Sequence, residues 1–491
     1  MSALDILVGG EWRPGRGAEI VTRSPYDGSV AGVVAGASVD DVDEAVRRGD
    51  AAMREASWHD MAAHDRAQLL HAAGRAIDAD SERLARLQTT DNGKPITETR
   101  ALVASAAGTF RYVAAALETL DDDMPVSRGP YFSMSVHEPL GVVGAITPWN
   151  SPIASDAQKV APALAAGNAV VLKPAEWTPL MALELGRILL EAGIPPGLVS
   201  ILPGPGRTVG QAIVEHPLVR KVAFTGGTGT GRGIAHVAAD KVMPVSLELG
   251  GKSPNVIFDD ADIDLAVRGA LYGIFSSQGQ ACIAGSRLFV QRSRYDEVLD
   301  RLVAGAGRLR VGNPHDETTH LGPLVSEQHL ESVDRYVRLA EAEGGDVVLG
   351  GKRLDGVDYD QGTYYPPTIV TGLTNRARVC QEEIFGPVLV VLPFDDEDDL
   401  VDQANDSVFG LACGLWTESY RRAWRVARRV EAGTVWVNTY KLLSSAAPFG
   451  GFKDSGIGRE KGRAWIHEYA AQKSVYWGTN EAPIQWSDVV L

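Results

Sequence analysis

The sequence has few cysteines, no recognisable metal motif and no long hydrophobic run. Three of its 491 residues are cysteine, in an odd and widely spaced set that is no disulfide framework, so we expect a reducing compartment, the cytoplasm. Neither CxxC nor HExxH occurs, so we expect no metal. The apolar run 160–172 is interrupted by Gly167 and Asn168 and is too short for a bilayer. The first residues do not read as a signal peptide.

Positive charge is also scarce. Lys and Arg number 47 against 63 Asp and Glu, a net charge of −16. Such an acidic surface repels phosphate backbones and anionic membranes, so we expect neither a nucleic-acid nor a membrane partner. The length of 491 residues predicts two to four domains, and 45% hydrophobic and 22% charged residues are typical of globular proteins.

The apolar pattern changes along the chain. After a short hairpin with its turn at Gly9-Gly10, helical periodicity is visible at 66–77, 82–90 and 97–117. From residue 142, short apolar runs begin near 142, 169, 198, 221 and 245, with helical patterns between them. This rhythm is typical of βαβ units and a parallel sheet. A second series occupies 255–258, 287–291, 368–371, 388–393 and 434–438. We predict two α/β domains joined near residues 248–252.

Ligands of such sheets bind beyond the carboxyl ends of the strands. The predicted ends are Asn150, 173–176, 203–206 and 224–229. The last two are rich in glycine but depart from GxGxxG, and no GxxxxGK[ST] is present. A glycine-rich turn from strand to helix either binds an anion through its N–H groups or is an ordinary tight turn.

Five residues carry the candidate chemistry, and each has a purely structural alternative. Cys282, in a loop of small residues, is a nucleophile or a buried apolar side chain. Glu248, between two leucines, is a desolvated general base or a salt-bridge partner. Asn150, after Pro-Trp, donates to an oxyanion or completes a turn. Glu383 and Phe385 contact a sugar and a flat ring, or are a loop acid and a core residue.

Taken together, the motifs resemble the hydrolytic, NAD(P)-dependent aldehyde dehydrogenases over essentially the whole chain. Cys282 follows Glu248 by 34 residues, the separation usual in that family. The motifs that appear in family order are PWN, KPAE, FTGGTGTG, LELGGK, GQACIAGSR, EEIFGPV and PFGGFKDSGIGRE.

The resemblance implies an α/β fold of the aldehyde dehydrogenase type. A Rossmann-type dinucleotide-binding domain would comprise 1–122 and 141–249, and an α/β catalytic domain 250–452. A small β oligomerisation extension would comprise 123–140 and 469–491. Alternating residues in 125–136 predict a hairpin in this extension. In the family the extension pairs with a neighbour's sheet, which implies a homodimer or homotetramer.

The resemblance also implies the reaction. Cys282 would attack the aldehyde to give a thiohemiacetal, whose oxyanion Asn150 and the Cys282 N–H would hold. Hydride transfer to the nicotinamide would leave a thioester. Glu248 would then activate the water that hydrolyses it to a carboxylic acid, and Glu460 matches a residue that helps proton exit in some members. Ala471 stands where some members have a second glutamate.

For the cofactor, the resemblance implies NAD, with NADP weaker. Lys173 and Glu176 would face the adenosine ribose, and Glu176 would repel a 2′-phosphate. Glu383 would bind the nicotinamide ribose beside Phe385. The remaining predicted cofactor residues are Trp149, Gly206, Phe224, Gly227 and Leu249.

The predicted substrate tunnel is polar. Asp156 and Gln158 stand in a segment where the family often has large apolar residues, so we expect a small, polar, semialdehyde or cyclic substrate. Lys441 would favour an anionic tail and Asp156 the opposite. The predicted substrate-binding residues are Ser151, Ser155, Ala281, Ile283, Lys441, Leu443 and Phe449.

Three other functions compete with this interpretation. A CoA-acylating aldehyde dehydrogenase shares the fold but usually lacks the base at Glu248. A non-catalytic binding protein on the fold would have lost the nucleophile or the base. A cysteine hydrolase without redox chemistry needs a histidine partner, and His467 is a weak candidate.

Overall fold

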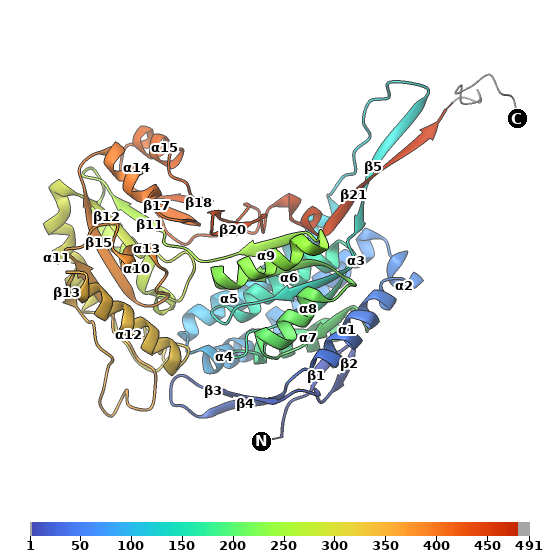
Figure 1. The fold of residues 1–491 in the computed structure, drawn as a ribbon, viewed down its shortest axis with the longest axis horizontal. Helices are drawn as coiled ribbons and strands as arrows, with labels where there is room; N and C mark the ends of the chain where they lie inside the picture. Colours follow the sequence, from blue (N-terminus) through green and yellow to red (C-terminus); the bar gives the residue numbers. More distant parts are fainter. Residues whose placement is uncertain (1, 480–491) are drawn as a thin grey trace, which may run out of the picture.

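The computed structural model describes residues 2–479. Two open β-sheets with their helices form the body of the molecule, and a two-stranded arm extends from the half that holds the first sheet (Figure 1). The described residues include no helix with the length and apolar character that a membrane crossing requires.

The first sheet has eight strands in the order β2-β1-β8-β7-β6-β9-β10-β20. Its five central strands, from β8 to β10, run parallel, and β6 and β7 are buried along their whole length. A strand buried on both faces requires helices on both faces, which explains the unbroken apolar runs in the sequence. The strands are β1 (Ile6–Val8), β2 (Glu11–Arg13), β6 (Val142–Ile146), β7 (Ala169–Lys173), β8 (Val199–Ile201), β9 (Val219–Thr225), β10 (Val245–Glu248) and β20 (Gly456–Ile457).

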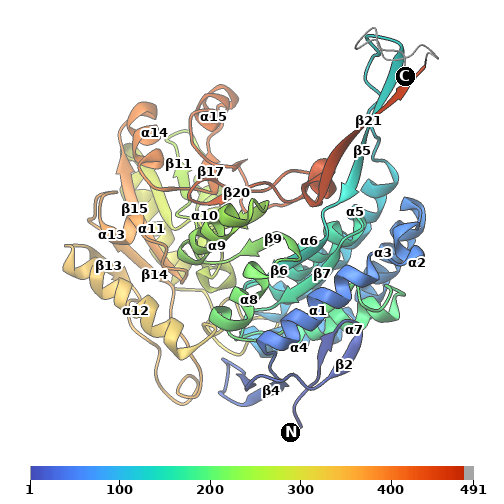
Figure 2. The ribbon, with the colours of Figure 1, turned by 45° about the vertical axis from the view of Figure 1, so that its right-hand side comes forward.

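Two ends of the helices in this half coincide with sequence signals. Ser38 caps the first of them in a capping box with Asp41, and Gly93 ends the fourth in the left-handed region at φ 75°. The helices are α1 (Val39–Ala52), α2 (Ala56–His59), α3 (Ala63–Ala79), α4 (Ser81–Asn92), α5 (Ile96–Glu118), α6 (Pro152–Ala165), α7 (Leu180–Glu191), α8 (Gln211–Glu215) and α9 (Thr228–Lys241). Figure 2 shows them around the sheet.

The second sheet has seven strands in the order β13-β14-β15-β12-β11-β17-β18, and all its pairs are parallel except the one that β13 makes. The strands are β11 (Pro254–Ile257), β12 (Arg287–Gln291), β13 (Asp346–Leu349), β14 (Thr368–Thr371), β15 (Val388–Phe394), β17 (Ala412–Trp416) and β18 (Thr434–Val437). Its helices are α10 (Ile263–Phe275), α11 (Tyr295–Ala306), α12 (Glu327–Ala342), α13 (Arg378–Gln381), α14 (Glu397–Asn405) and α15 (Tyr420–Ala427).

All ten predicted strands of the two series are present, and the predicted hairpin at Gly9-Gly10 joins β1 and β2. The sequence analysis missed a second hairpin, β3 (Glu19–Arg23) with β4 (Val30–Ala35), and the central strand β17. The sequence of β17, ACGLW, lacks β-branched residues, so its strand character arises from burial between two neighbours and not from propensity.

The predicted hairpin in 125–136 is wrong. The alternating residues do form a strand, β5 (Tyr131–Pro139), but its partner is β21 (Ala470–Gly478) at the far end of the chain. In this antiparallel arm Ala471 lies opposite Glu138. Alternation identifies a strand but not its partner, and here the partner is more than 300 residues away. The last predicted residues of the extension, 480–491, lie outside the described residues.

The chain crosses from the first sheet to the second between Glu248 and Pro254. It returns after residue 452, because β20 pairs with β10, and Trp465, Ile466 and Tyr469 pack into the core of the first sheet. The exact domain boundaries stay a prediction.

The side chain of Asn168 forms hydrogen bonds to three different segments of the chain. Its buried side chain accepts from Gly141 N at 2.9 Å and donates to Ala163 O at 3.0 Å and Tyr469 O at 2.9 Å. The base of the arm, the end of α6 and the start of β21 therefore share one amide.

Replacing Asn168 by Ala should lower the free energy of unfolding by about 2–4 kcal/mol, because three buried polar groups lose their partner. Urea unfolding followed by circular dichroism measures this. Asn405→Ala removes a partly exposed amide that bonds Arg429 O and Glu431 N, so its effect should be clearly smaller. Equal losses of unfolding free energy in the two variants would contradict the stabilising role of the three buried hydrogen bonds of Asn168.

Candidate active site

Two strands of the first sheet deliver polar residues to one place. Asn150 follows β6 in the turn that leads into α6, and Glu248 is the last residue of β10. Because both strands are parallel members of one sheet, their carboxyl ends lie at the same edge. Asn150 Nδ2 donates to Gln280 O at 2.9 Å, which ties this edge to the loop that carries Cys282.

The loop before Cys282 has an unusual backbone. Ser277, Gln278 and Gly279 all have positive φ angles, of 57°, 56° and 70°. A Cβ added to Gly279 would lie 2.0 Å from Gly386 O, so only glycine fits there.

Two buried glutamines hold this loop. Gln278 Nε2 donates to Gly93 O at 2.8 Å and Pro323 O at 3.0 Å, while Gln280 Oε1 accepts from Val325 N at 3.0 Å. Strained residues persist only where the surroundings over-determine them, and they are common at functional sites. The loop therefore presents Cys282 at a fixed position.

Cys282 is half-buried and faces a cavity of about 350 Å³. Burial raises the pKa of its thiol to about 12, and the negative charges of Glu383 and Glu248 act in the same direction. The backbone N–H groups of Cys282 and Ile283 lower this pKa. At neutral pH the sulfur therefore carries its proton, and a base must remove it before the sulfur attacks a carbonyl.

Glu248 lines the same cavity and is only 5% exposed. Burial raises its pKa well above the usual value, and the charge of Glu460 raises it further, whereas Lys159, Arg459 and Lys461 act in the opposite direction. Its Oε2 has no hydrogen-bond partner among the described residues. A carboxyl group in this condition is suited to accept a proton near neutral pH.

Glu460 lies in the same cavity, and its Oε1 accepts from the ammonium of Lys159 at 2.6 Å. Both side chains are buried, and the two residues are 301 positions apart in the sequence. Glu248, Glu460 and Lys159 thus form a buried group of charges behind the cavity.

The cavity contains every predicted catalytic and substrate-binding residue. Its walls include Cys282, Glu248 and Asn150, and also Ser151, Ser155, Ala281, Ile283, Lys441, Leu443 and Phe449.

Several further residues line this cavity without having been predicted from the sequence, chiefly Lys94, Glu98, Tyr272 and Lys461. Lys94 and Glu98 follow α4 by only a few residues, far from any recognised motif, so no local signal marks them. Their place in the site results from the packing of α5 against the loop before Cys282, where Ser277 donates to Glu98 from its N at 2.8 Å and its Oγ at 2.5 Å.

The proposed influence of Asp156 on substrate charge is wrong. Asp156 is fully buried and does not line the cavity, although Ser155 and Gln158 do. Successive helical residues point about 100° apart, so Asp156 faces the interior when Ser155 faces the cavity. Burial raises the pKa of Asp156 to about 7, while Thr147 and Lys159 lower it.

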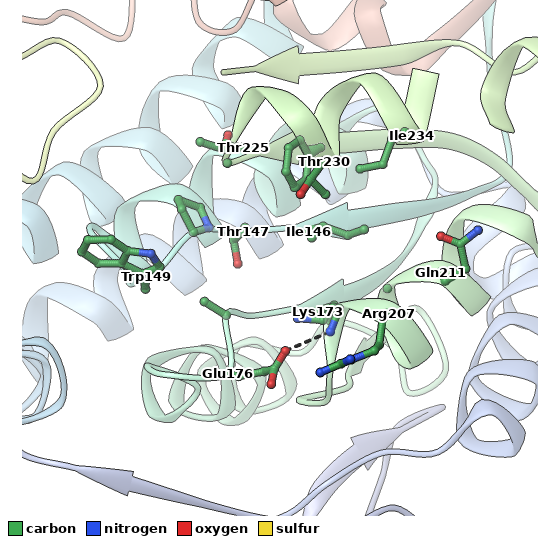
Figure 3. Close-up of a pocket in the computed structure, with 18 of the residues that line it drawn as sticks. Ile146, Thr147, Trp149, Lys173, Glu176, Arg207, Gln211, Thr225, Thr230 and Ile234 are labelled. Atoms are coloured by element: carbon green, nitrogen blue, oxygen red, sulfur yellow. Dashed lines mark hydrogen bonds between the residues drawn. The ribbon is translucent and has the colours of Figure 1, made fainter. Parts of the chain in front are cut away.

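A second cavity, of about 710 Å³, adjoins the first, and Thr225 lines both. Its walls include the predicted cofactor residues Trp149, Lys173, Glu176, Gly206, Phe224 and Gly227. In Figure 3, Lys173, Glu176 and Arg207 lie together on one wall, opposite Thr230 and Ile234 of α9. Sequence reasoning missed Arg207, because no motif includes it.

The second cavity fits a dinucleotide. Atoms added as Cβ at Gly206 and Gly227 would meet nothing within 4 Å, so the backbone there is open to a ligand. Gly227 begins α9 without a side-chain cap, which leaves N–H groups at a positive helix end for phosphates. Glu176 Oε1 accepts from Gly206 N at 2.9 Å, and its second oxygen is available for ribose hydroxyls.

Three predicted cofactor residues lie beside this cavity, not in its wall. Glu383 accepts from Gly251 N at 3.0 Å, and burial raises its pKa to about 7. The Phe385 ring lies edge-on to Trp149, with the ring centroids 5.2 Å apart. The side chain of Leu249 lies against Gly231 of α9.

Comparisons with known proteins agree with this geometry. The model of the aldehyde dehydrogenase family matches residues 12–475. A protein of Bacillus subtilis (strain 168) named "Putative aldehyde dehydrogenase DhaS" is 41% identical over 462 residues, 94% of this chain and 92% of that protein.

Solved structures are equally similar. The NAD⁺ complex of an aldehyde dehydrogenase from Bacillus cereus has a TM-score of 0.95 and 40% identity, covering 98% of this chain and 97% of that one. A betaine aldehyde dehydrogenase from Staphylococcus aureus in complex with NAD⁺ has a TM-score of 0.97 and 37% identity, covering 99% and 97%.

A thiol, a buried carboxyl and an amide line one cavity beside a second cavity that is open to a dinucleotide, and this arrangement is compatible with an oxidoreductase. The chain belongs to the aldehyde dehydrogenase family.

Replacing Gly279 by Ala should abolish most activity and lower the free energy of unfolding by more than about 2 kcal/mol, because the added Cβ meets Gly386 O and φ is positive. Thermal unfolding and NADH formation measure the two effects. Gly108→Ala in α5 is the control: its nearest atom is 3.9 Å away, so it should stabilise the helix slightly. A fully active Gly279→Ala enzyme would contradict the rigid-loop interpretation.

Proposed function

We propose that this protein oxidises an aldehyde to the carboxylic acid with NAD through a thioester on Cys282. The observation that carries the proposal is that Cys282, Glu248 and Asn150 line one cavity that adjoins an open dinucleotide cradle. The balance requires one aldehyde, one NAD⁺ and one water for each carboxylate anion, NADH and two protons.

The cradle residues hold the cofactor. Glu176 accepts from the adenosine ribose hydroxyls, and the N–H groups at the start of α9 bind the pyrophosphate. NAD supplies the hydride acceptor when it is bound. Glu176 disfavours the 2′-phosphate of NADP, but the positive charge of Arg207 in the same wall reduces this discrimination, so we expect NADP to be used weakly.

The first step is the loss of the thiol proton and the attack of sulfur on the carbonyl carbon. The high pKa of Cys282 makes a base necessary, and Glu248 is the buried carboxylate in the same cavity. Desolvation that raises the pKa of Glu248 brings its proton affinity closer to that of the thiol, which favours the transfer.

The thiohemiacetal oxygen then carries negative charge. Asn150 uses one amide hydrogen to donate to Gln280 O, and its second amide hydrogen is free for the substrate. Together with the backbone N–H of Cys282, it forms an oxyanion site. This stabilised negative oxygen favours departure of hydride from the same carbon, which leaves the thioester.

Hydrolysis of the thioester needs an activated water. Glu248 accepts a proton from this water, and the nearby Glu460 and Lys159 offer a route for it out of the cavity. The presence of a buried carboxyl at this point supports transfer to water over transfer to CoA.

The polar walls support a small or functionalised substrate. Ser151, Ser155 and Gln158 replace the apolar surface that a long alkyl chain would need, and the cavity volume is about 350 Å³.

We also propose that the protein self-associates as a dimer or tetramer through its arm. Tyr476 and Trp477 near the end of β21 are 67% and 56% exposed. Large apolar side chains exposed in this way are typical of a surface that contacts another protein chain. All three cysteines are free thiols, which supports a place in the reducing cytoplasm.

Cys282→Ala should abolish NADH formation with every aldehyde, because no sulfur is left to attack the carbonyl carbon. NAD binding should be unchanged, because Cys282 does not line the cofactor cavity. Absorbance at 340 nm and calorimetric titration with NAD measure these. The control is Cys380→Ala, which removes a buried thiol outside the cavity and should retain turnover. Turnover by the Cys282→Ala protein would refute the assignment.

Glu248→Gln should reduce steady turnover by about 100-fold or more, because hydrolysis loses its general base. A burst of one NADH per site should remain but form more slowly than in the wild type, because the thiol of Cys282 also loses the carboxylate proposed to accept its proton. Below its raised pKa the wild-type Glu248 is protonated and inactive, so the hydrolytic rate should rise with pH through that pKa and be flat in the variant. Stopped-flow absorbance from pH 5.5 to 9 tests both.

The outcome of the burst separates two roles. A lost burst would mean that Glu248 serves mainly to activate Cys282. The exposed Glu431→Gln variant, which lacks the same charge, should behave as wild type. Product analysis with and without CoA checks that the acid, and not an acyl-CoA, is formed.

A further inference from the structure

Lys441 stands on the rim of the substrate cavity. Its side chain is half-buried and lines the cavity, while the next two residues, Leu442 and Leu443, are 69% and 47% exposed. It follows β18 in the second sheet, and its backbone has a φ of 58°, a left-handed conformation that is unfavourable for a residue other than glycine. The position is therefore held by its surroundings.

The ammonium of Lys441 has only neutral partners. Its Nζ donates to Ser276 Oγ at 2.7 Å and to Ser276 O at 3.4 Å, and it lies 5.7 Å from the centre of the Tyr272 ring. Within residues 2–479, no carboxylate forms an ion pair with it. Burial removes part of the water that would stabilise this positive charge, and no carboxylate replaces the lost water, so a bound anion would be stabilised here.

A second lysine lines the same cavity. Lys94 is 3% exposed, and the closest approach of its ion pair with Glu98 is 4.0 Å, beyond hydrogen-bond distance. Glu98 is itself engaged by the N–H and hydroxyl of Ser277. Two ammonium groups thus share one carboxylate, which leaves one positive charge in excess.

The other two lysines of this region each lie near a carboxyl group. Lys461 lies near both Glu460 and Glu248, whose charges raise its pKa against the effect of burial. Glu460 also holds Lys159. The excess positive charge therefore lies at the Lys94 and Lys441 end. Both of these lysines interact through space with the charge that Cys282 acquires as a thiolate.

We infer that the substrate is an aldehyde with a carboxylate at its other end, and that Lys441, supported by Lys94, is the residue that binds this carboxylate. The inference rests on the proposed function, because it places the aldehyde carbon at Cys282. One carboxylate neutralises the excess charge of the two ammonium groups, and the hydroxyl of Ser276 offers it a further donor.

A cationic aldehyde is disfavoured by the same residues. Recognition of a quaternary ammonium group uses aromatic faces. The two aromatic rings of the cavity, Tyr272 and Phe449, each already have a lysine ammonium over the ring. The positive charge of Lys94 and Lys441 at this end of the cavity would therefore repel a cationic substrate.

The test uses three aldehydes of equal chain length and different tail charge: 4-oxobutanoate, butanal and 4-(trimethylammonio)butanal. With the full-length wild-type enzyme and NAD, kcat/KM should be at least tenfold higher for 4-oxobutanoate than for butanal, and lowest for the cation. Lys441→Gln should lower kcat/KM for 4-oxobutanoate by about 10- to 100-fold, mainly through KM, and lower that for butanal by a clearly smaller factor, because butanal has no charged tail.

Other substitutions at Lys441 and a control at a distant lysine test whether the charge of residue 441 sets the preference. Lys441→Arg should preserve the preference for the anion, and Lys441→Glu should reverse it toward the cation. The exposed Lys352→Gln variant loses the same charge away from the cavity and should not alter the ranking.

Two outcomes overturn the inference without touching the proposed function. These are wild-type turnover of butanal at least as efficient as that of 4-oxobutanoate, and an equal loss for both substrates in Lys441→Gln. NADH formation with none of the three aldehydes, by protein that binds NAD, would overturn the proposed function as well.

Discussion

Removal of ionisable groups from water is the constraint on which this site depends. Between the two sheets, Glu248 is buried and Cys282 and Glu383 are half-buried, and this burial raises the pKa of all three. In each case burial shifts the equilibrium toward the neutral form. The site therefore combines a thiol that holds its proton tightly with a carboxyl group whose raised pKa brings its proton affinity closer to that of the thiol.

The geometry that permits this chemistry comes from two different sources. The parallel first sheet fixes Asn150 and Glu248 at the ends of strands, where position follows from the hydrogen-bonded register. The position of Cys282 depends instead on a strained loop held by side chains of Gln278 and Gln280. A rigid sheet and an over-determined loop together give a site with little need for rearrangement before the reaction.

The sequence was a good guide wherever a signal was local. The apolar runs predicted the strands of both sheets because buried parallel strands leave unbroken runs, and the strand ends led directly to Asn150, Lys173, Glu176 and Glu248. The candidate site could be assembled only through the family resemblance, because spacing alone does not show that residues 150, 248 and 282 meet.

The failures share a physical cause. The partner of β5, the inward orientation of Asp156 and the presence of Lys94 and Glu98 in the cavity all depend on contacts between distant parts of the chain. Alternation and periodicity specify a strand or a helix face but not which surface will cover it. The family resemblance places Lys441 at the substrate wall, but only the structure shows that its bonded partners are neutral.

The return of the chain after residue 452 has a consequence for biosynthesis. The first sheet begins at residue 6, yet its edge strand β20, the partner of Lys159 and the second strand of the arm all come from the last 40 residues or so. A nascent chain emerging from the ribosome therefore folds its second sheet while the first is still incomplete. During that interval, a buried lysine lacks its counter-charge and a long strand lacks its partner, so the released chain must complete these late contacts before it is safe from aggregation.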